Sequence, residues 1–488
     1  MKALSWWVMK SCWWVCCILM WVCQPTAALQ STAEQSAAKK NVTQPRVATT
    51  CAVPTPHASA AQSALQPKSV DKTRYQQQLQ GFWLGLSIAN WTGLVTEMDK
   101  IGGDGPQGQF YRRDDWGKPD QPSIWGQGIP SELSSTIDWV VQSPDGVWGS
   151  DDDSDIEYIY LDAMAKSASP LLTPQQIRDA WLAHIYRDDE TPARTKDGKP
   201  ENFLWVSNQQ AFDLMQQGVL PPLTGMLPWN PHYDMIDAQL TTELFGALAP
   251  GRPDLAIQLA YLPIRTTASG EAADIAQFYV VLHAMAANVD AKQPLKPQVL
   301  AMAKAARRFL PDDQYPARMF DFVWSRYAAG DSWEQARDAV YQRYQVQMQD
   351  NYRLSARQLY CNGCFAAGIN FASSIVSLLY GAGDMQQTIQ IAVLAGWDSD
   401  NPAATWGGWY GLMLGRDGVE RTFGRTFSQR FNIHRTRKGF ATAATPNGID
   451  TFDAMATRGV QVIDRVVQQL AKGRYDQHCW TIPAAPSS

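Results

Sequence analysis

Residues 173–185 read TPQQIRDAWLAHI, and this stretch carries the start pattern that decides the fold class. Thr173 is a preferred N-cap residue, the proline after it suits the first helical position, and Gln176 completes a capping box. Apolar side chains then follow at helical spacing at Ile177, Trp181 and Ile185. The stretch therefore predicts a helix with one buried face.

Similar start signals recur along the chain, at Ser207 with Gln210 (closed by Gly218), Ser332 with Gln335, and Asp384 with Gln387. Further apolar runs with helical period occupy residues 77–90, 236–248, 252–261, 272–287, 297–309, 366–381, 402–414 and 451–471. Alternating strand patterns are scarce. These patterns predict an all-α domain of a dozen or more helices.

The composition is that of a globular protein: 488 residues, 45% hydrophobic and 18% charged. The formal net charge is −5 and the isoelectric point is near 5.7. A chain with this charge has no extensive positively charged surface that would bind the phosphate backbone of a nucleic acid, so we expect no nucleic-acid partner.

The N-terminus has the pattern of a secretory signal peptide. Lys2 and Lys10 precede an apolar run at residues 12–23, and small residues follow up to Ala28. We expect residues 1–28 to be cleaved and the protein to be exported, to the periplasm or outside the cell, with membrane contact only through this segment. The alternative, an uncleaved membrane anchor, is disfavoured because a spanning helix needs roughly 20 apolar residues, more than the run at residues 12–23 provides. Lipid attachment at Cys23 is disfavoured by the bulky residues before it.

Residues 29–75 are rich in Ala, Gln, Ser, Thr and Pro and predict a flexible linker. One domain is expected over residues 76–480, with a tail at 481–488. Four cysteines remain after the signal, an even number that suits an oxidising compartment: Cys51, Cys361, Cys364 and Cys479. The close pair 361–364 is open to three interpretations, namely a redox pair, half a zinc site, or a structural disulfide or buried thiols, and the last is the simplest.

Two acidic clusters each lie directly before a helical run, at residues 149–157 and 394–404. Carboxylates at a helix N-terminus ordinarily cap free N–H groups. Capping alone does not explain the second cluster. Apolar residues precede it and a helix of small residues follows, which implies that its carboxylates are buried. Buried carboxylates need cations or hydrogen bonds, and oxygen ligands without matching histidines favour magnesium or calcium.

Several segments resemble the ADP-ribosylglycohydrolase family. Residues 81–97 are similar to its opening glycine-spaced helix, which ends in a glutamate, and residues 236–260 are similar to its middle segment. Asp-Asp-Asp-Ser at 151–154 and Gly-Trp-Asp-Ser-Asp-Asn at 396–401 resemble its two metal motifs. The resemblance implies an all-α, orthogonal multi-helix hydrolase that holds two Mg²⁺ ions and cleaves the glycosidic bond at the ribose of a small-molecule or protein-linked ADP-ribosyl or ribosyl substrate.

The resemblance also implies roles for individual residues. The metal-ligand positions fall on Asp151, Asp152, Asp153, Asp398, Asp400 and Asn401, and the catalytic carboxylate of some members falls on Glu97. Candidate substrate contacts are Asn90, Asp237 and Trp397. Trp397 replaces a glycine of the family motif, so its indole is expected to narrow the pocket or to offer a stacking face.

The sequence pattern is compatible with three functions. The first is a magnesium-dependent glycohydrolase. The second is a non-catalytic protein in which metal organises a nucleotide or sugar pocket. In the third, calcium merely joins the helices through the carboxylates.

Overall fold

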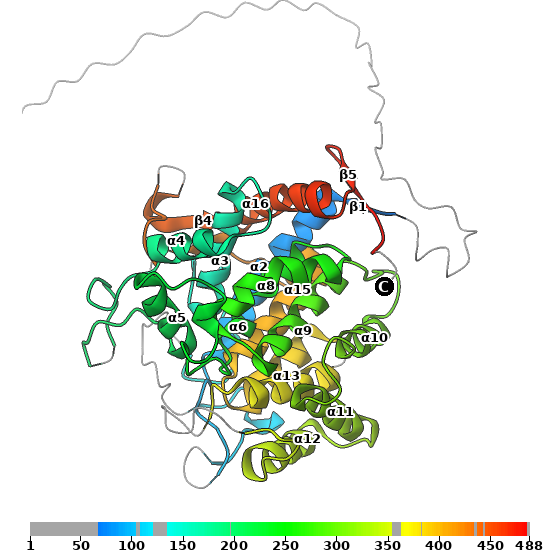
Figure 1. Ribbon diagram of the computed structural model, residues 1–488. Coiled ribbons are helices and arrows are strands. Elements are labelled where there is room, and N and C mark those ends of the chain that lie inside the picture. Colours follow the sequence, from blue (N-terminus) through cyan, green and yellow to red (C-terminus); the bar gives the residue numbers. More distant parts are fainter. Residues whose placement is uncertain are drawn as a thin grey trace, which may run out of the picture. The chain divides into compact units, whose positions relative to one another are not determined.

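The computed structural model describes residues 67–103, 108–120, 134–195, 197–353, 363–381, 383–433, 437–442 and 445–485. The predicted signal peptide and residues 29–66 of the predicted linker lie outside these residues. Helices dominate the described part (Figure 1), which confirms the predicted all-α class.

The α-helices are α2 (Lys72–Gly93), α3 (Asp152–Lys166), α4 (Pro174–His184), α5 (Val206–Gln216), α6 (Asp237–Leu240), α7 (Glu243–Ala247), α8 (Pro253–Thr267), α9 (Glu271–Ala286), α10 (Leu295–Arg307), α11 (Tyr315–Ala328), α12 (Trp333–Val340), α13 (Ala367–Gly381), α14 (Met385–Ala395), α15 (Asp400–Phe423) and α16 (Phe452–Arg465). The strands are β1 (Lys68–Asp71), β2 (Trp148–Gly149), β3 (Arg430–Asn432), β4 (Ile449–Thr451), β5 (Arg474–Tyr475) and β6 (Cys479–Ile482). They form two three-stranded sheets, ordered β1-β6-β5 and β2-β3-β4.

Three of the predicted helix starts are present. Thr173 caps α4 with the expected proline and capping box, Ser332 caps α12 with a capping box, and the Asp384 side chain accepts from the Gln387 N–H before α14. The start at Ser207 was wrong. Helix α5 begins one residue earlier, and the Ser207 hydroxyl donates instead to the carbonyl of Thr267.

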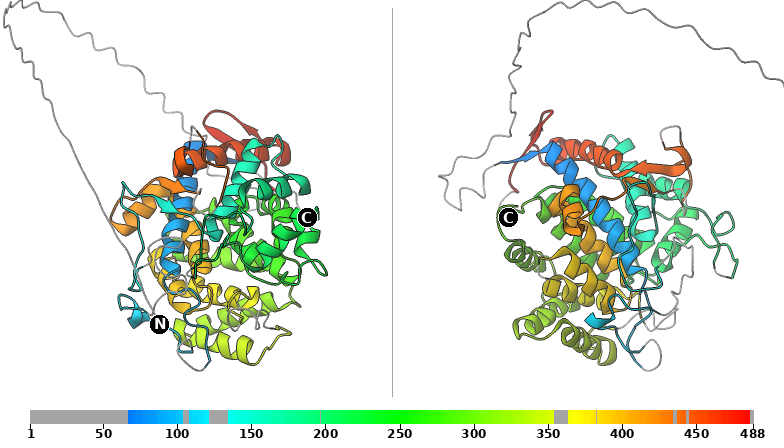
Figure 2. Two further views of the ribbon diagram at one scale, coloured as in Figure 1. Left: turned by 90° about the vertical axis from the view of Figure 1, so that its left-hand side faces the viewer. Right: turned by 180° about the vertical axis from the view of Figure 1, so that it is seen from behind.

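The centre of the fold is the contact between α2 and α15, which run side by side in three views (Figures 1 and 2). Glycines let the two backbones touch. A Cβ at Gly81 would lie 2.2 Å from the Gly411 carbonyl oxygen, and a Cβ at Gly85 would lie 2.1 Å from that of Gly407. This confirms the close packing expected from the small residues after the second acidic cluster, and it brings the C-terminal end of α2 to the start of α15.

The ends of the ordered domain differ from the predicted boundaries. Strand β1 and the first turn of α2 lie within the predicted linker, and β6 extends into the predicted tail. The two strands pair antiparallel, with Lys68 opposite Ile482 and Asp71 opposite Cys479. Composition alone did not reveal these strands, because each is stabilised by a partner from the opposite end of the chain.

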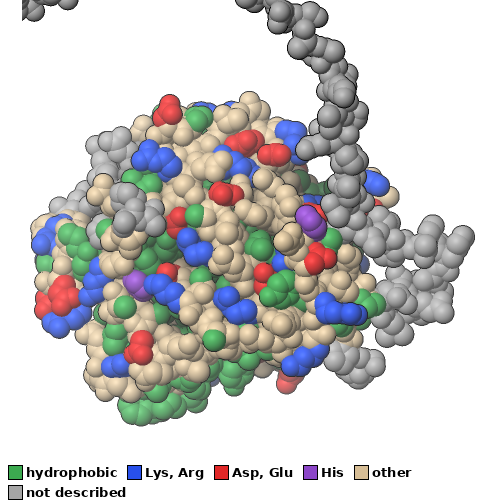
Figure 3. All heavy atoms as spheres, turned by 90° about the horizontal axis from the view of Figure 1, so that it is seen from above, with side chains coloured by type: hydrophobic (Ala, Val, Ile, Leu, Met, Phe, Trp, Pro, Cys, Tyr) green, Lys and Arg blue, Asp and Glu red, His purple; other side chains and the backbone are tan. Residues whose placement is uncertain are grey.

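Two cysteines, Cys364 and Cys479, are each in a disulfide bond. Cys51 and Cys361 lie outside the described residues, so their part in the predicted cysteine pattern is not addressed by the structure. None of the described helices is long and apolar enough to cross a membrane. On the face seen from above, acidic and basic side chains are interspersed (Figure 3).

Candidate metal centre

Six carboxylates from four separate elements line one pocket. They come from the turn after α2, the first turn of α3, the start of α6 and the segment that opens α15: Glu97, Asp152, Asp153, Asp237, Asp398 and Asp400. All six had been predicted as site residues. The sequence motifs, up to about three hundred residues apart, therefore meet in a single place.

All of these carboxylates except Asp237 belong to one of two groups of three, and within each group the candidate ligand oxygens lie within 4.8 Å of one another. One group is Glu97 with Asp398 and Asp400, and the other is the run Asp151–Asp153. Each group offers three carboxylate oxygens, which is the kind of donor that hard divalent cations prefer. Asp151 belongs to the second group although it is not among the residues that line the pocket.

Backbone hydrogen bonds fix the Glu97 turn against the segment before α15. The Met98 N–H donates to the Trp397 carbonyl and the Trp397 N–H donates to the Lys100 carbonyl, both at 2.8 Å. Gly396 is needed here because its φ is +93° and a Cβ would lie 2.4 Å from the Lys100 carbonyl oxygen. The Thr96 hydroxyl adds a 2.6 Å bond to the Val393 carbonyl. Glu97 and Asp398 are thereby held at adjoining positions.

Asn370 of α13 is a site-supporting residue that the sequence reasoning missed. Its Oδ1 accepts from the Asp398 backbone N–H at 3.2 Å, and its Nδ2 donates to the carbonyls of Cys364 at 2.5 Å and Ala366 at 3.0 Å. The amide thus ties the Asp398 backbone to the segment before α13. Nothing in the local sequence distinguishes this asparagine, since the site residue that it contacts, Asp398, lies 28 positions further along the chain.

Two predicted residues lie behind the carboxylates rather than in the pocket lining. Asn90 donates from Nδ2 to Asp151 Oδ2 at 2.6 Å. Asn401 donates from Nδ2 to Asp153 Oδ1 at 3.1 Å, while its own Oδ1 accepts from Gln239 at 3.3 Å. Both amides therefore orient aspartates in this structure. Their predicted roles, substrate contact for Asn90 and metal ligation for Asn401, stay predictions.

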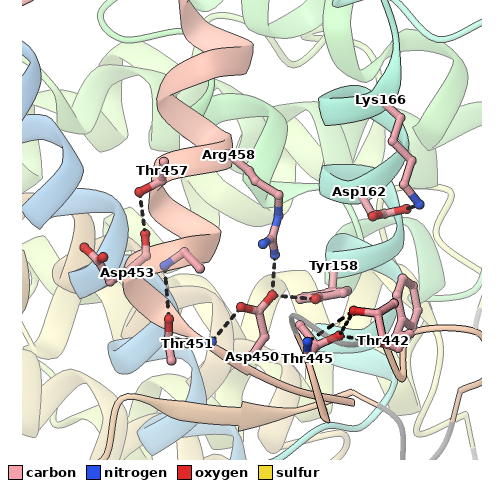
Figure 4. A network of polar contacts seen from close by, with 12 residues as sticks. Tyr158, Asp162, Lys166, Thr442, Thr445, Asp450, Thr451, Asp453, Thr457 and Arg458 are labelled. Carbon is pink, nitrogen blue, oxygen red and sulfur yellow. Dashed lines mark hydrogen bonds and ion pairs between the residues drawn. The ribbon is translucent and has the colours of Figure 1, made fainter. Parts of the chain in front are cut away.

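Helix α3, whose start carries the group Asp151–Asp153, is linked to α16 by hydrogen bonds through Asp450. Figure 4 shows Asp450 between Tyr158 of α3 and Arg458 of α16. Asp450 Oδ2 accepts from the Tyr158 hydroxyl at 2.6 Å and from Arg458 Nη2 at 2.5 Å. None of these three residues belongs to the pocket lining, so their contribution is to the position of the helix.

Burial and mutual repulsion raise the pKa of the pocket carboxyls. Desolvation raises the pKa of Asp152 to about 7, although the Arg437 guanidinium opposes the shift, and raises that of Asp237 to about 6. The pKa of Asp153 lies well above its usual value through desolvation and the charge of Asp400, and that of Asp398 does so through desolvation and the charge of Asp153. Without a cation, these negative charges are held together at a cost.

The donor set fits a divalent cation such as Mg²⁺. Asp151 Oδ1 and Asp400 Oδ1 are buried and have no hydrogen-bond partner among the described residues. A buried charged oxygen destabilises the folded protein unless a cation or a hydrogen-bond donor contacts it. The described residues of the pocket lining include no histidine or cysteine, which disfavours zinc.

Trp397 does not have the predicted place in the pocket. Its side chain is fully buried, its Nε1 donates to Gln345 Oε1 at 2.5 Å, and its ring lies 4.7 Å from that of Phe110. The indole therefore offers no face to the pocket, and the expectation that it would narrow it or stack there was wrong. The backbone takes a positive φ of 61° at this residue, which directs the side chain into the core while its peptide groups hold the Glu97 turn.

The aromatic side chains that do line the pocket are Trp205 and Phe365, and the sequence reasoning missed both. Trp205 is half-buried and directly precedes α5, with a φ of 45°. A positive φ is rare for a bulky residue and costs of order 1–3 kcal/mol. No periodic signal marks either residue, because neither belongs to the apolar stripe of a helix.

A family model described as ADP-ribosylglycohydrolase matches residues 71–445. The chain belongs to the ADP-ribosylglycohydrolase family. The match spans the described elements from α2 to the segment after α15, and so includes both carboxylate groups. The resemblance seen in the sequence is confirmed, and membership of this family implies a hydrolase.

Comparison with solved structures gives a chain described as "ADP-ribosylglycohydrolase-related protein complex". It is 14% identical, covers 80% of this chain and 99% of its own, and superposes with a TM-score of 0.44. This likeness adds nothing to the family match. No curated protein sequence matches the chain.

Proposed function

We propose that the protein is an exported, magnesium-dependent glycohydrolase that cleaves the glycosidic bond at the ribose of an ADP-ribosyl or related ribosyl substrate. The observation that carries the proposal is the convergence of two three-carboxylate groups on one pocket. Family membership supports the reaction class. A non-catalytic binding protein with the same metal centre would need the same carboxylates, so turnover is what separates the two.

The aspartates would bind two cations in two separate sets. Asp151, Asp152 and Asp153 would hold one ion, and Asp398 and Asp400 would hold a second. Bound divalent cations at such a site supply Lewis acidity toward vicinal ribose hydroxyls and an attacking water. Asn90 and Asn401 keep Asp151 and Asp153 oriented through the hydrogen bonds given above.

Glu97 would act as the general base. It is buried in the pocket beside Asp398 and Asp400 and would take a proton from the water that attacks the anomeric carbon. The transition state for cleavage at that carbon has oxocarbenium character, and the surrounding carboxylates favour the positive charge that develops.

The test is hydrolysis by the purified mature form, with Mg²⁺, of ADP-ribosyl-arginine, ADP-ribosyl-serine, ADP-ribose and simple nucleosides. We expect turnover of at least one substrate, and its loss in the double variant D398A/D400A. E97Q should lower kcat by about 10²–10⁴-fold. No turnover on the whole panel by metal-loaded protein would contradict the proposal and favour a binding function.

Export is a separate part of the proposal. The positively charged start, the apolar run of residues 12–23 and the small residues before position 29 support it. Expression of the full chain with a secretion-competent host should yield protein outside the cytoplasm whose N-terminus, by mass spectrometry, is Leu29. Intact Met1 on cytoplasmic protein would contradict it.

A further inference from the structure

The pocket lining contains two chemical kinds of side chain. Six are carboxylates, and others are apolar, among them Trp205, Val206 and Phe365. Phe365 is 6% exposed, whereas Trp205 is only half-buried. Trp205 is thus the large aromatic side chain in the described lining that remains partly open to a ligand. Neither the family match nor the sequence motifs assign it a role.

Buried hydrogen bonds hold the unusual backbone that brings Trp205 to the pocket. Phe203 and Trp205 both have positive φ, 51° and 45°. Arg437 donates from Nη1 to the Asn202 carbonyl at 2.7 Å and from Nη2 to the Phe203 carbonyl at 3.3 Å. The Leu204 N–H donates to the Asn202 side chain at 3.1 Å. A segment that only links two helices would not need these buried hydrogen bonds. They therefore fix the backbone that determines the position of Trp205.

The same guanidinium also contacts the helix that carries two of the lining aspartates. Arg437 Nε lies 3.2 Å from Asp155 Oδ2, and both side chains are fully buried. Asp155 is in the first turn of α3, two residues after Asp153. Arg437 is therefore a positioning residue that sets Trp205 at a defined place relative to the carboxylates.

We propose that Trp205 is a specificity-determining residue that stacks on a planar heteroaromatic leaving group joined to the ribose through nitrogen. This rests on the proposed function, because the carboxylates must hold the ribosyl part. The face of an indole suits a planar ring, and the adjoining apolar side chains exclude water around it. In the reaction the water oxygen bonds to the anomeric carbon, the C–N electron pair leaves with the ring nitrogen, and the water proton passes to Glu97.

Binding of the free base tests the proposal without any turnover. Calorimetry on magnesium-loaded protein would use nicotinamide and adenine as probes. For at least one base we expect W205A and W205L to weaken binding about tenfold or more, a factor that corresponds to about 1.4 kcal/mol, while W205F keeps most of the affinity. W205L preserves bulk without an aromatic ring, so it separates stacking from a collapsed pocket. W229A is the matched control, since Trp229 is 44% exposed and is not part of the pocket lining.

Turnover then separates this proposal from the proposed function. If the wild type hydrolyses both nicotinamide riboside and methyl ribofuranoside, W205A should raise KM for the first and leave kcat/KM for the second within about twofold. Equal loss on both substrates would show a purely structural role and overturn the proposal. So would base affinities that do not change in W205A or W205L, or absence of base binding by the wild type. Absence of all hydrolysis with base binding that depends on Trp205 would instead refute the glycohydrolase and leave the stacking site standing.

Discussion

Gly93, the last residue of α2, lies directly against Asp400, the first residue of α15: a Cβ at position 93 would be 2.3 Å from the Asp400 Cα. The neighbouring atoms are backbone and Cβ atoms of a pocket residue, so they cannot turn aside as a flexible side chain would. The two helices thus set the place of Asp400 through a contact that only a glycine permits.

The substitution G93A should therefore damage the metal site more than the fold. We expect the free energy of unfolding to fall by about 1–3 kcal/mol and the Kd for Mg²⁺ to rise at least tenfold, measured by denaturant titration and calorimetry. G459A is the control, because a Cβ there meets only the ends of flexible side chains, Leu79 at 3.0 Å and Leu248 at 3.6 Å. Unchanged Mg²⁺ affinity in G93A would show that Asp400 tolerates the shift.

Neutralising the pocket should stabilise the metal-free protein and remove its response to metal. The pKa of both Asp398 and Asp400 is raised by burial and by neighbouring carboxylates, so their charges repel in the absence of a cation. D398N or D400N should raise the metal-free Tm, by about 2–4 °C for each kcal/mol of repulsion relieved, and Mg²⁺ should no longer raise it further.

The wild type and D312N, whose Asp312 side chain is 91% exposed, should both gain Tm on adding Mg²⁺. Scanning calorimetry with and without chelator measures all four proteins. A lower metal-free Tm in both pocket variants would mean that the carboxylates stabilise the fold by their hydrogen bonds alone.

The two described disulfide cysteines should differ in their effect on the site. Loss of either bond, in C364S or C479S, should lower the free energy of unfolding by roughly 2–5 kcal/mol. Only C364S should also weaken Mg²⁺ binding, because the Cys364 carbonyl accepts from Asn370, which in turn accepts from the Asp398 N–H. Denaturation curves and calorimetry are the measurements, and equal Mg²⁺ affinity in the two variants would refute this coupling.

His283 should make the fold sensitive to acid. Desolvation lowers its pKa from 6.5 to about 4, and its Nδ1 lies 2.9 Å from the Tyr279 carbonyl oxygen. Because the unfolded chain binds the proton more tightly, stability is lost as pH falls from the unfolded value toward the folded one. Over that range the wild type should lose about 3 kcal/mol relative to H283L.

Denaturant unfolding at pH steps between 7 and about 4 measures that difference, in which the titration of other groups cancels. The exposed His478 provides the control variant H478L, which should keep the slope of the wild type. Parallel curves for the wild type and H283L would show that His283 is not kept neutral by the fold.

The sequence was a good guide wherever the cause of structure is local. Thr173 and Ser332 cap their helices as predicted, because an N-cap and its capping-box partner lie within one turn. It failed at Ser207, which has the same pattern but bonds to a carbonyl of α8 instead. It also missed β1, whose partner strand is the distant β6.

The sequence by itself determined the helical class, the family and the carboxylates of the site, since these depend on residue type and on spacing within short motifs. Only the tertiary structure decided which tryptophan faces the pocket. Trp397 lies next to Asp398 in sequence but points into the core, while Trp205 reaches the pocket from a distant segment. The reason is physical: both have a positive φ, and long-range hydrogen bonds to the flanking backbone select that conformation.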